Sequence, residues 1–203
     1  MSLIKQQINY FVTEYKQPDF YRFNEDSIKL VNHVLSQTHN HERILDLGAG
    51  SGVIGIELAN SLNSRELTLL EIQSDFEPSL KFNCEKILSK DVSYEIHIKS
   101  FSDWAPIKPF DLIVCNPPYF LPEHGQPNRD YRKQICRSFQ SDSWVILLEK
   151  MKISLSYAGR AYIVVKDNPI VLSEIHKAIS GLRHKITKKD NLLFIELSGL
   201  DVD

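Results

Sequence analysis

The sequence is poor in cysteine, in long apolar runs and in excess charge of either sign. Its 203 residues include three cysteines, Cys84, Cys115 and Cys136, which are widely spaced and odd in number. This usage gives neither a disulfide framework nor the spacing of a zinc site, and it fits a reducing cytoplasm. No run approaches the roughly 20 apolar residues of a membrane helix. The first residues, MSLIKQQINYF, lack the apolar core and cleavage site of a signal peptide. We therefore expect a cytoplasmic protein with no membrane partner.

The charge balance excludes one class of nucleic-acid-binding protein. The formal net charge is -2, which excludes binding through global basicity but not through a local basic patch. Hydrophobic residues make up 42% of the chain, and a chain of this length can bury a continuous core without disulfides or metals. No internal repeat, low-complexity run or linker divides it. We expect a single domain over residues 1–203.

The first forty residues carry apolar side chains at helical spacing. This pattern predicts a helix from Leu3 to Tyr15, which Pro18 ends, and a second helix from Glu25 to Ser36. Asn24 is a suitable N-cap for the second helix because its side chain can accept from the first free amides. Residues 1–42 therefore read as a helical extension that precedes the main fold.

Beyond residue 42, short apolar strands alternate with helices. The expected strands are 43–47, 66–72, 94–99, 110–115, 161–166, 185–187 and 192–197, and the expected helices are 53–62, 78–88, 143–155 and 170–181. Such alternation is typical of a mostly parallel sheet with helices on both faces. The last two strands are joined by Lys189-Asp190-Asn191, which favours an antiparallel hairpin at the sheet edge. The prediction for residues 43–203 is an α/β core with a seven-stranded sheet.

The first expected strand runs into a glycine-rich loop, Asp46-Leu47-Gly48-Ala49-Gly50-Ser51-Gly52. Glycines at alternate positions let the backbone turn sharply and let a ligand approach without meeting a Cβ atom. Nineteen residues after Gly52, at the end of the second expected strand, stands Glu71. A carboxylate there can accept hydrogen bonds from both ribose hydroxyls of a nucleoside. The pair predicts a nucleotide site at the carboxyl edge of the sheet.

The same loop also permits a dinucleotide interpretation. Gly50, Gly52 and Gly55 spell G-x-G-x-x-G, which is weak evidence by itself. Asp46 decides between the two, because a carboxylate before the glycines would repel a pyrophosphate and attract a cationic cofactor. S-adenosylmethionine carries an ammonium and a sulfonium, so we favour the methyl donor.

With these features the sequence resembles the class I S-adenosylmethionine-dependent methyltransferases, over roughly Arg43 to Leu197. The resemblance implies a Rossmann-like fold and S-adenosylmethionine as cofactor. The cofactor site that it implies comprises Asp46, Gly48, Ala49, Gly50, Ser51, Gly52, Glu71, Ile72, Ser100, Phe101 and Asn116. Many relatives have an aspartate where alignment on Trp104 gives Ser100. We expect the Ser100 hydroxyl, or Asp103, to take over the contact with the adenine amino group.

The fourth expected strand delivers Asn116-Pro117-Pro118-Tyr119-Phe120 to the same edge of the sheet. Two prolines fix two φ angles and remove two backbone donors, which leaves a rigid turn with outward carbonyl acceptors. A planar amino group can donate one hydrogen to the Asn116 side chain and the other to the Pro117 carbonyl, while Tyr119 stacks on it. Two acceptors localise the nitrogen lone pair for methyl transfer. Asn116, Pro117, Pro118 and Tyr119 are therefore the candidate catalytic residues.

This loop is the signature of methyltransferases acting on exocyclic adenine nitrogens in DNA or RNA and on glutamine amides in release factors. The segments Phe20 to Ser27 and Arg129 to Ser138 are similar to those of bacterial tRNA adenine-N6 methyltransferases that modify valine tRNA. The resemblance implies methylation of the N6 of adenine in structured RNA such as tRNA. The candidate substrate-binding residues are Phe23, Phe120, Arg129 and Arg132, the arginines through RNA phosphates.

Two other functions stay open. A protein-glutamine methyltransferase is similar at the loop, but it normally carries a separate N-terminal helical domain, and only about forty residues precede the first expected strand here. A cofactor-binding protein without catalysis would not need the Asn116 loop. We expect no metal, because His39 and His41 stand in a polar connector without a third ligand. Cys115 reads as a buried core thiol.

Overall fold

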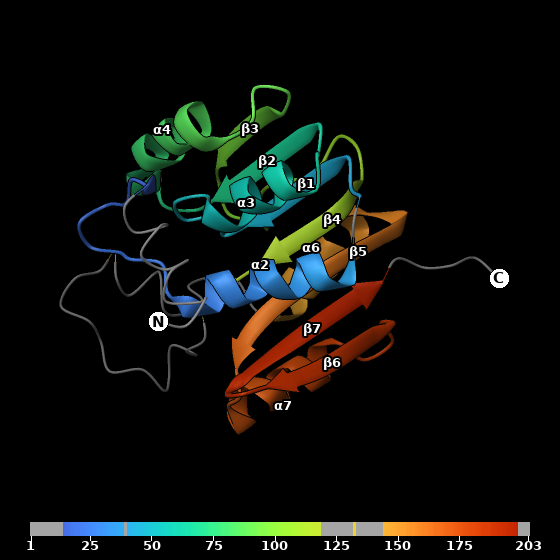
Figure 1. Ribbon diagram of the computed structural model, residues 1–203. Helices are drawn as coiled ribbons and strands as arrows, with labels where there is room; N and C mark the ends of the chain where they lie inside the picture. The colour runs from blue at the N-terminus through green and yellow to red at the C-terminus, as the bar shows by residue number, and fades with distance from the viewer. Residues whose placement is uncertain (1–13, 39, 119–131, 133–143, 199–203) are drawn as a thin grey trace.

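The computed structural model describes residues 14–38, 40–118, 132 and 144–198. Seven strands form one sheet in the order β3-β2-β1-β4-β5-β7-β6 (Figure 1). The strands are β1 (Arg43–Leu47), β2 (Glu66–Glu71), β3 (Ser93–Ile98), β4 (Phe110–Cys115), β5 (Leu155–Lys166), β6 (His184–Lys189) and β7 (Leu192–Ser198). The helices are α2 (Glu25–Gln37), α3 (Val53–Ser61), the 3₁₀ turn η1 (Ser74–Phe76), α4 (Glu77–Ile87), α6 (Trp144–Ser154) and α7 (Pro169–Ala178).

Strand direction places the candidate site loops at one edge of the sheet. The first five strands pair in parallel, so their carboxyl ends meet at the same edge of the sheet. Only β7 runs antiparallel, between β5 and β6. The expected mostly parallel sheet with an antiparallel C-terminal hairpin is therefore confirmed.

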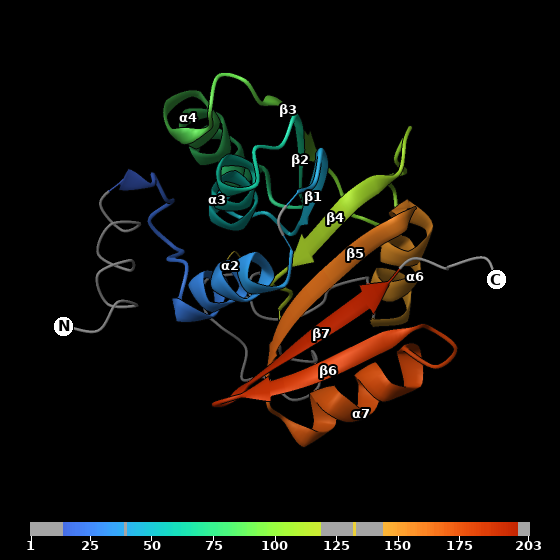
Figure 2. The same ribbon diagram turned by 45° about the vertical axis from the view of Figure 1, so that its right-hand side comes forward.

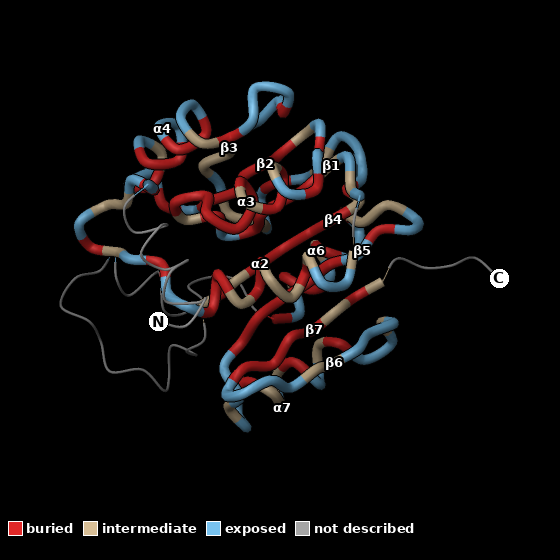
Figure 3. Tube along the Cα trace, in the orientation of Figure 1, coloured by how far each residue is buried: buried red, intermediate tan, exposed pale blue. Residues whose placement is uncertain are grey.

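Helices cover both faces of this sheet, as the view in Figure 2 makes plain. One buried cluster joins α2, α3 and α4 to the sheet, and a second joins α6 and α7 to the opposite face. The central strands are buried along nearly their whole length (Figure 3). These strands are continuous apolar runs in the sequence because helices cover both faces of the sheet. Side chains on either face are therefore buried, and apolar residues do not alternate with polar ones. Across the described residues, no helix is long and apolar enough to cross a membrane.

Two strands differ from their expected bounds by more than one residue at an end. The fifth begins at Leu155, directly after α6, rather than at Ala161. Leu155 pairs with Phe110, and a register shift then follows before Leu112 pairs with Arg160. The bulged residues between them lack an apolar pattern, so the sequence hid this part of the strand. The strand at the sheet edge spans His184–Lys189 rather than 185–187 because its pairing with β7 extends it at both ends.

The hairpin between β6 and β7 is tighter than expected. Lys189 belongs to β6, so only Asp190 and Asn191 make the turn. Asp190 has a φ of 56°, a left-handed conformation that aspartate tolerates better than most side chains. The helix expected from Leu3 to Tyr15 lies mostly outside the described residues, which begin at Glu14.

Candidate active site

Three residues of the expected site lie next to one another at the ends of neighbouring strands, because each comes directly after a residue that pairs across the sheet. Leu47, the last residue of β1, pairs with Leu70 of β2 on one side and with Cys115 of β4 on the other. The next positions along these parallel strands are Gly48, Glu71 and Asn116. The register therefore brings the glycine loop, the acid and the Asn-Pro-Pro turn together at the carboxyl edge, where open α/β sheets bind ligands.

The glycine loop is held by backbone bonds to the neighbouring strand. The amides of Gly48 and Ala49 donate to the carbonyl of Leu70, at 2.8 and 3.1 Å. Gly48, Gly50 and Gly52 all have positive φ, at 73°, 54° and 81°. Residues that carry a side chain rarely adopt this backbone conformation, which explains why glycine occupies these positions. Among the described residues, a Cβ atom built on Gly48 would meet no heavy atom within 4 Å, so this part of the structure leaves open space there.

Glu71 is buried and linked to the loop through its carboxylate. One oxygen accepts from the Gly50 amide at 2.8 Å and the other from the Gln73 amide at 2.9 Å. Burial raises the pKa of Glu71, although these backbone hydrogen bonds oppose the rise. The Ile72 amide also bonds this carboxylate. Because the two oxygens offer about four acceptor sites, Glu71 can still accept from a hydroxyl.

Asp46 is fully buried beneath the loop. Its Oδ2 accepts from the Gly55 amide at the start of α3, at 2.8 Å, whereas its Oδ1 has no hydrogen-bond partner in the described structure. Burial raises the pKa of Asp46 to about 7, and the nearby Glu71 adds to the rise. A buried, unpartnered carboxylate oxygen costs free energy unless a donor or a positive charge satisfies it. The site is thus suited to a cationic group.

These features fit the expected cofactor. The buried carboxylates of Asp46 and Glu71 suit a ligand with a positive charge and paired hydroxyls, and the open space at Gly48 admits close approach of the backbone. Ile72 follows Glu71 with 43% of its surface exposed, which leaves an apolar side chain beside the site. S-adenosylmethionine combines an ammonium, a sulfonium and a ribose, so its groups match what this edge offers.

The segment before α2 covers the glycine loop, and the sequence reasoning missed the residues that hold it there. Asn83 of α4 is fully buried; its Oδ1 accepts from the Lys16 amide, and its Nδ2 donates to the Lys16 and Ser51 carbonyls at 2.9 and 2.8 Å. Tyr21 meets Phe76 edge-on, with ring centroids 5.2 Å apart. Atoms of these two rings lie 3.9 and 3.7 Å from a Cβ built on Gly50.

The Asn-Pro-Pro turn is anchored by a contact that no local pattern predicted. Asn116 is half-buried, and its Nδ2 donates to the Oγ of Ser27 on α2 at 3.0 Å. Pro117 is buried and Pro118 half-buried. The expected catalytic residue Tyr119 lies outside the described residues. The expected substrate contacts Phe120 and Arg129 lie outside them too.

The other residues expected to contact the cofactor or the substrate differ in their burial and in their neighbours. The Ser100 hydroxyl lies 2.7 Å from that of Ser102, and the Ser102 amide donates to it at 3.2 Å. Phe101 packs against the cluster on the α6 face. Phe23 is buried in the opposite cluster with 8% of its surface exposed. The Arg132 guanidinium lies 4.6 Å from the centre of the Phe20 ring and 3.8 Å from the Asp75 carboxylate. The roles of these residues stay predictions.

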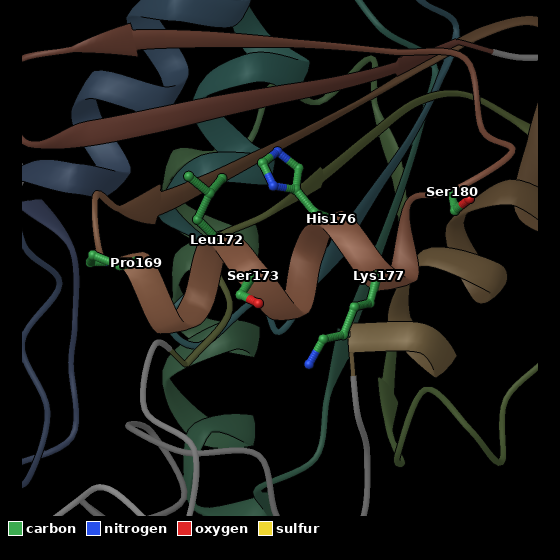
Figure 4. Close-up of a pocket in the computed structure, with 6 residues that line it drawn as sticks. All are labelled: Pro169, Leu172, Ser173, His176, Lys177 and Ser180. Atoms are coloured by element: carbon green, nitrogen blue, oxygen red, sulfur yellow. The ribbon is translucent and has the colours of Figure 1, made fainter.

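Other candidate chemistry lies away from this edge or is buried. Cys115 is buried, and burial raises the pKa of its thiol well above the usual value, as expected for a core residue. In the described ranges no three potential ligands gather to hold a metal. A shallow surface pocket is lined by Pro169, Leu172, Ser173, His176, Lys177 and Ser180 (Figure 4). All of these belong to α7 or follow it, and none is an expected site residue.

The chain is similar in sequence to curated proteins that share one name. Over 117 residues the chain is 32% identical to a "tRNA1(Val) (adenine(37)-N6)-methyltransferase" of Glaesserella parasuis, covering 58% of this chain and 48% of the relative. A protein of the same name in Pedobacter heparinus is 29% identical over 146 residues, covering 71% and 59%. The chain thus spans about half the length of these curated relatives.

The fold matches solved methyltransferases as well. The 16S rRNA methyltransferase RsmC of T. thermophilus, solved in complex with AdoMet and guanosine, has a TM-score of 0.64 at 16% identity. That match covers 88% of this chain and 44% of the other. At such identity the likeness supports the Rossmann-like fold alone. The sequence profile of the methyltransferase small domain family matches residues 22–141, more than half of the chain. The chain therefore belongs to the methyltransferase small domain family, and its sheet has the expected Rossmann-like arrangement.

Proposed function

We propose that the protein methylates the exocyclic N6 of adenine in structured RNA such as tRNA. The observation that carries this proposal is the register at the carboxyl edge. Leu47 of β1 pairs with Cys115 of β4. Gly48 follows Leu47 and Asn116 follows Cys115, so the register sets Asn116 beside Gly48. An acceptor for an amino group therefore borders the loop expected to hold the methyl donor. The names of the Glaesserella and Pedobacter relatives support adenine in tRNA as the target.

The residues at this edge divide the work between binding and positioning. Asp46 and Glu71 would hold the cationic and ribose ends of the cofactor, and Gly48 would let it approach the backbone. Bound S-adenosylmethionine supplies a methyl group activated by the positive charge of its sulfonium. The Asn116 carboxamide oxygen and the Pro117 carbonyl accept the two hydrogens of the target amine, which turns its lone pair out of conjugation. The N–C bond would form as the S–C bond breaks, with S-adenosylhomocysteine as the leaving group. The alkylated nitrogen is cationic and acidic, so it would release one proton to water without a strong general base, and positioning and electrostatics would lower the barrier.

The test uses RNA transcribed in vitro with the sequence of tRNA1(Val), incubated with labelled S-adenosylmethionine. We expect label in N6-methyladenosine and its loss when adenine 37, the position named for the relatives, is replaced by guanine. Total protein is assayed in parallel. Label in glutamine and none in RNA would overturn the RNA assignment in favour of a protein substrate.

A pair of asparagine variants separates catalysis from cofactor binding. Asn116→Ala removes the acceptor but leaves the carboxylates of Asp46 and Glu71 in place, so we expect turnover to fall at least about 100-fold while S-adenosylhomocysteine is still bound. Asn60→Ala is the matched control, since the Asn60 side chain bonds the Ile87 carbonyl and the Ser89 amide away from this edge. Undiminished turnover in Asn116→Ala would contradict the proposed role.

A further inference from the structure

Ser27 stands where it can control the catalytic carboxamide. It is the third residue of α2, and only 4% of its surface is exposed. Its Oγ lies 3.0 Å from the Asn116 Nδ2, although the two residues are 89 positions apart in the chain. The helix that carries Ser27 packs against α3 and β5, so its first turn is fixed relative to the end of β4. A buried hydroxyl on a packed helix thus faces the amide that the proposed chemistry needs.

The orientation of that amide decides whether it can serve. A carboxamide presents an acceptor oxygen on one branch of Cγ and an NH₂ donor on the other, and rotation by half a turn exchanges them. Only the oxygen can accept from an amine hydrogen. In the reversed orientation a donor would face a donor, and the target nitrogen would lose one of its two acceptors.

We propose that Ser27 is a positioning residue that sets this orientation, an inference that rests on the proposed function of Asn116. Its Oγ accepts from Nδ2, and this turns the Asn116 oxygen to the other branch, away from α2. In this contact Oγ is the acceptor, because the Asn116 NH₂ group has no lone pair to accept a hydroxyl proton. The contact therefore holds one of the two amide orientations.

Nuclear magnetic resonance of the Asn116 side-chain amide tests the contact without any substrate. Its signals in ¹⁵N-labelled protein are identified by their loss in Asn116→Asp. We expect Ser27→Ala to shift these signals and speed exchange of the Nδ2 protons, and Ser27→Thr, which keeps the hydroxyl, to retain the wild-type signals. Ser79→Ala is the control, because Ser79 is the third residue of α4 and is also 4% exposed. Unchanged Asn116 signals in Ser27→Ala would overturn the proposal.

Turnover on the tRNA1(Val) transcript tests the consequence. Ser27→Ala should lower kcat by about three- to tenfold, the effect of one hydrogen bond, with an unchanged KM for S-adenosylmethionine. Ser27→Thr and Ser79→Ala should keep the wild-type kcat. In an Asn116→Ala background, Ser27→Ala should cause no further loss, because Ser27 acts only through that amide. Additive losses, or a loss confined to KM, would overturn the positioning role.

The two measurements separate this inference from the proposed function. If wild-type protein methylates no RNA, the substrate proposal fails, while the amide signals still decide whether Ser27 orients Asn116. If RNA is methylated at the same rate in Ser27→Ala, the substrate proposal stands and the inference about Ser27 fails.

Discussion

The Gly50 amide donates to the Glu71 carboxylate at 2.8 Å, which ties the glycine loop to the end of the neighbouring strand. The same carboxylate accepts from the Gln73 amide through its other oxygen. The acid expected to bind the ribose therefore also shapes the loop expected to surround the methionine end of the cofactor. If Glu71 binds the ribose as expected, loop conformation and ribose binding are coupled through one side chain.

Replacing that carboxylate should weaken both functions. In Glu71→Gln the new NH₂ group replaces one of two oxygens that both accept from backbone amides, so a donor must face a donor. This disturbs the glycine loop and removes the charge, so we expect cofactor affinity to fall at least about tenfold. The free energy of unfolding should fall by about 1–3 kcal/mol. Calorimetry with S-adenosylhomocysteine and denaturant titration measure the two effects. Glu66→Gln is the control on the same strand, since Glu66 bonds Arg43 at the far end of β2. Full affinity in Glu71→Gln would contradict the expected ribose contact.

Two glycines of the loop should respond differently to alanine. Gly48→Ala places a methyl group in open space, at a φ of 73°, so it should cost about 1 kcal/mol of stability but strongly reduce cofactor affinity. Gly52→Ala should destabilise more, because its Cβ would lie 3.0 Å from Leu80 and 3.2 Å from Ile56. Thermal unfolding and calorimetry distinguish the two.

Gly181→Ala is the matched control for Gly48→Ala. Gly181 has a φ of 80° and open space around it, but it follows α7 away from the glycine loop. It should show the same small stability loss with unchanged affinity. Equal affinity losses at both positions would mean that backbone strain, rather than occupation of the space, accounts for the effect.

The raised pKa of Asp46 predicts how stability depends on pH. Between its ordinary value of 3.8 and about 7, the native carboxyl keeps a proton that the unfolded chain has released. Stability attributable to Asp46 is therefore greatest at low pH. It falls by up to about 1.4 kcal/mol per pH unit across that window, and becomes constant above it.

Comparison of wild type with Asp46→Asn isolates this contribution from other titrating groups. The variant has no proton to release at this position, so wild type should lose stability relative to it as pH rises from 5 to 7. Denaturant titrations at pH 5, 6, 7 and 8 measure the difference. A difference that is constant with pH, or one that grows in favour of wild type, contradicts the buried protonated form.

The covering segment before α2 should depend on Asn83. Asn83→Ala leaves the Lys16 amide and two carbonyls without their buried partner, so we expect a loss of about 2–4 kcal/mol. Amide hydrogen exchange in residues 14–24 should accelerate. Asn60→Ala, which removes an asparagine bonded to the end of α4, should lower stability without this local change in exchange. Unaltered protection of residues 14–24 in Asn83→Ala would show that other contacts hold the segment.

The sequence alone was sufficient to predict the central fold and to place the glycine loop, Glu71 and Asn116 at one edge of the sheet. The β4 strand Phe110–Cys115 was predicted with its observed bounds, since an apolar run buried on both faces is visible locally. The glycine loop and Glu71 could be read for the same reason, because glycine spacing and strand ends are short-range features. The bounds of β5 were wrong, because a bulge opposite Phe110 depends on pairing rather than on local pattern.

The tertiary structure decided what surrounds these residues. Ser27 meets Asn116 because α2 packs on β5 beside β4, and Asn83 holds Lys16 because α4 packs near the segment before α2. Neither partner could be read from sequence, since residues 89 and 67 positions apart carry no local signal of contact. Local residue patterns determined which groups reach the carboxyl edge. Long-range packing determined which neighbours orient them, because hydrogen-bond partners depend on where separate elements meet.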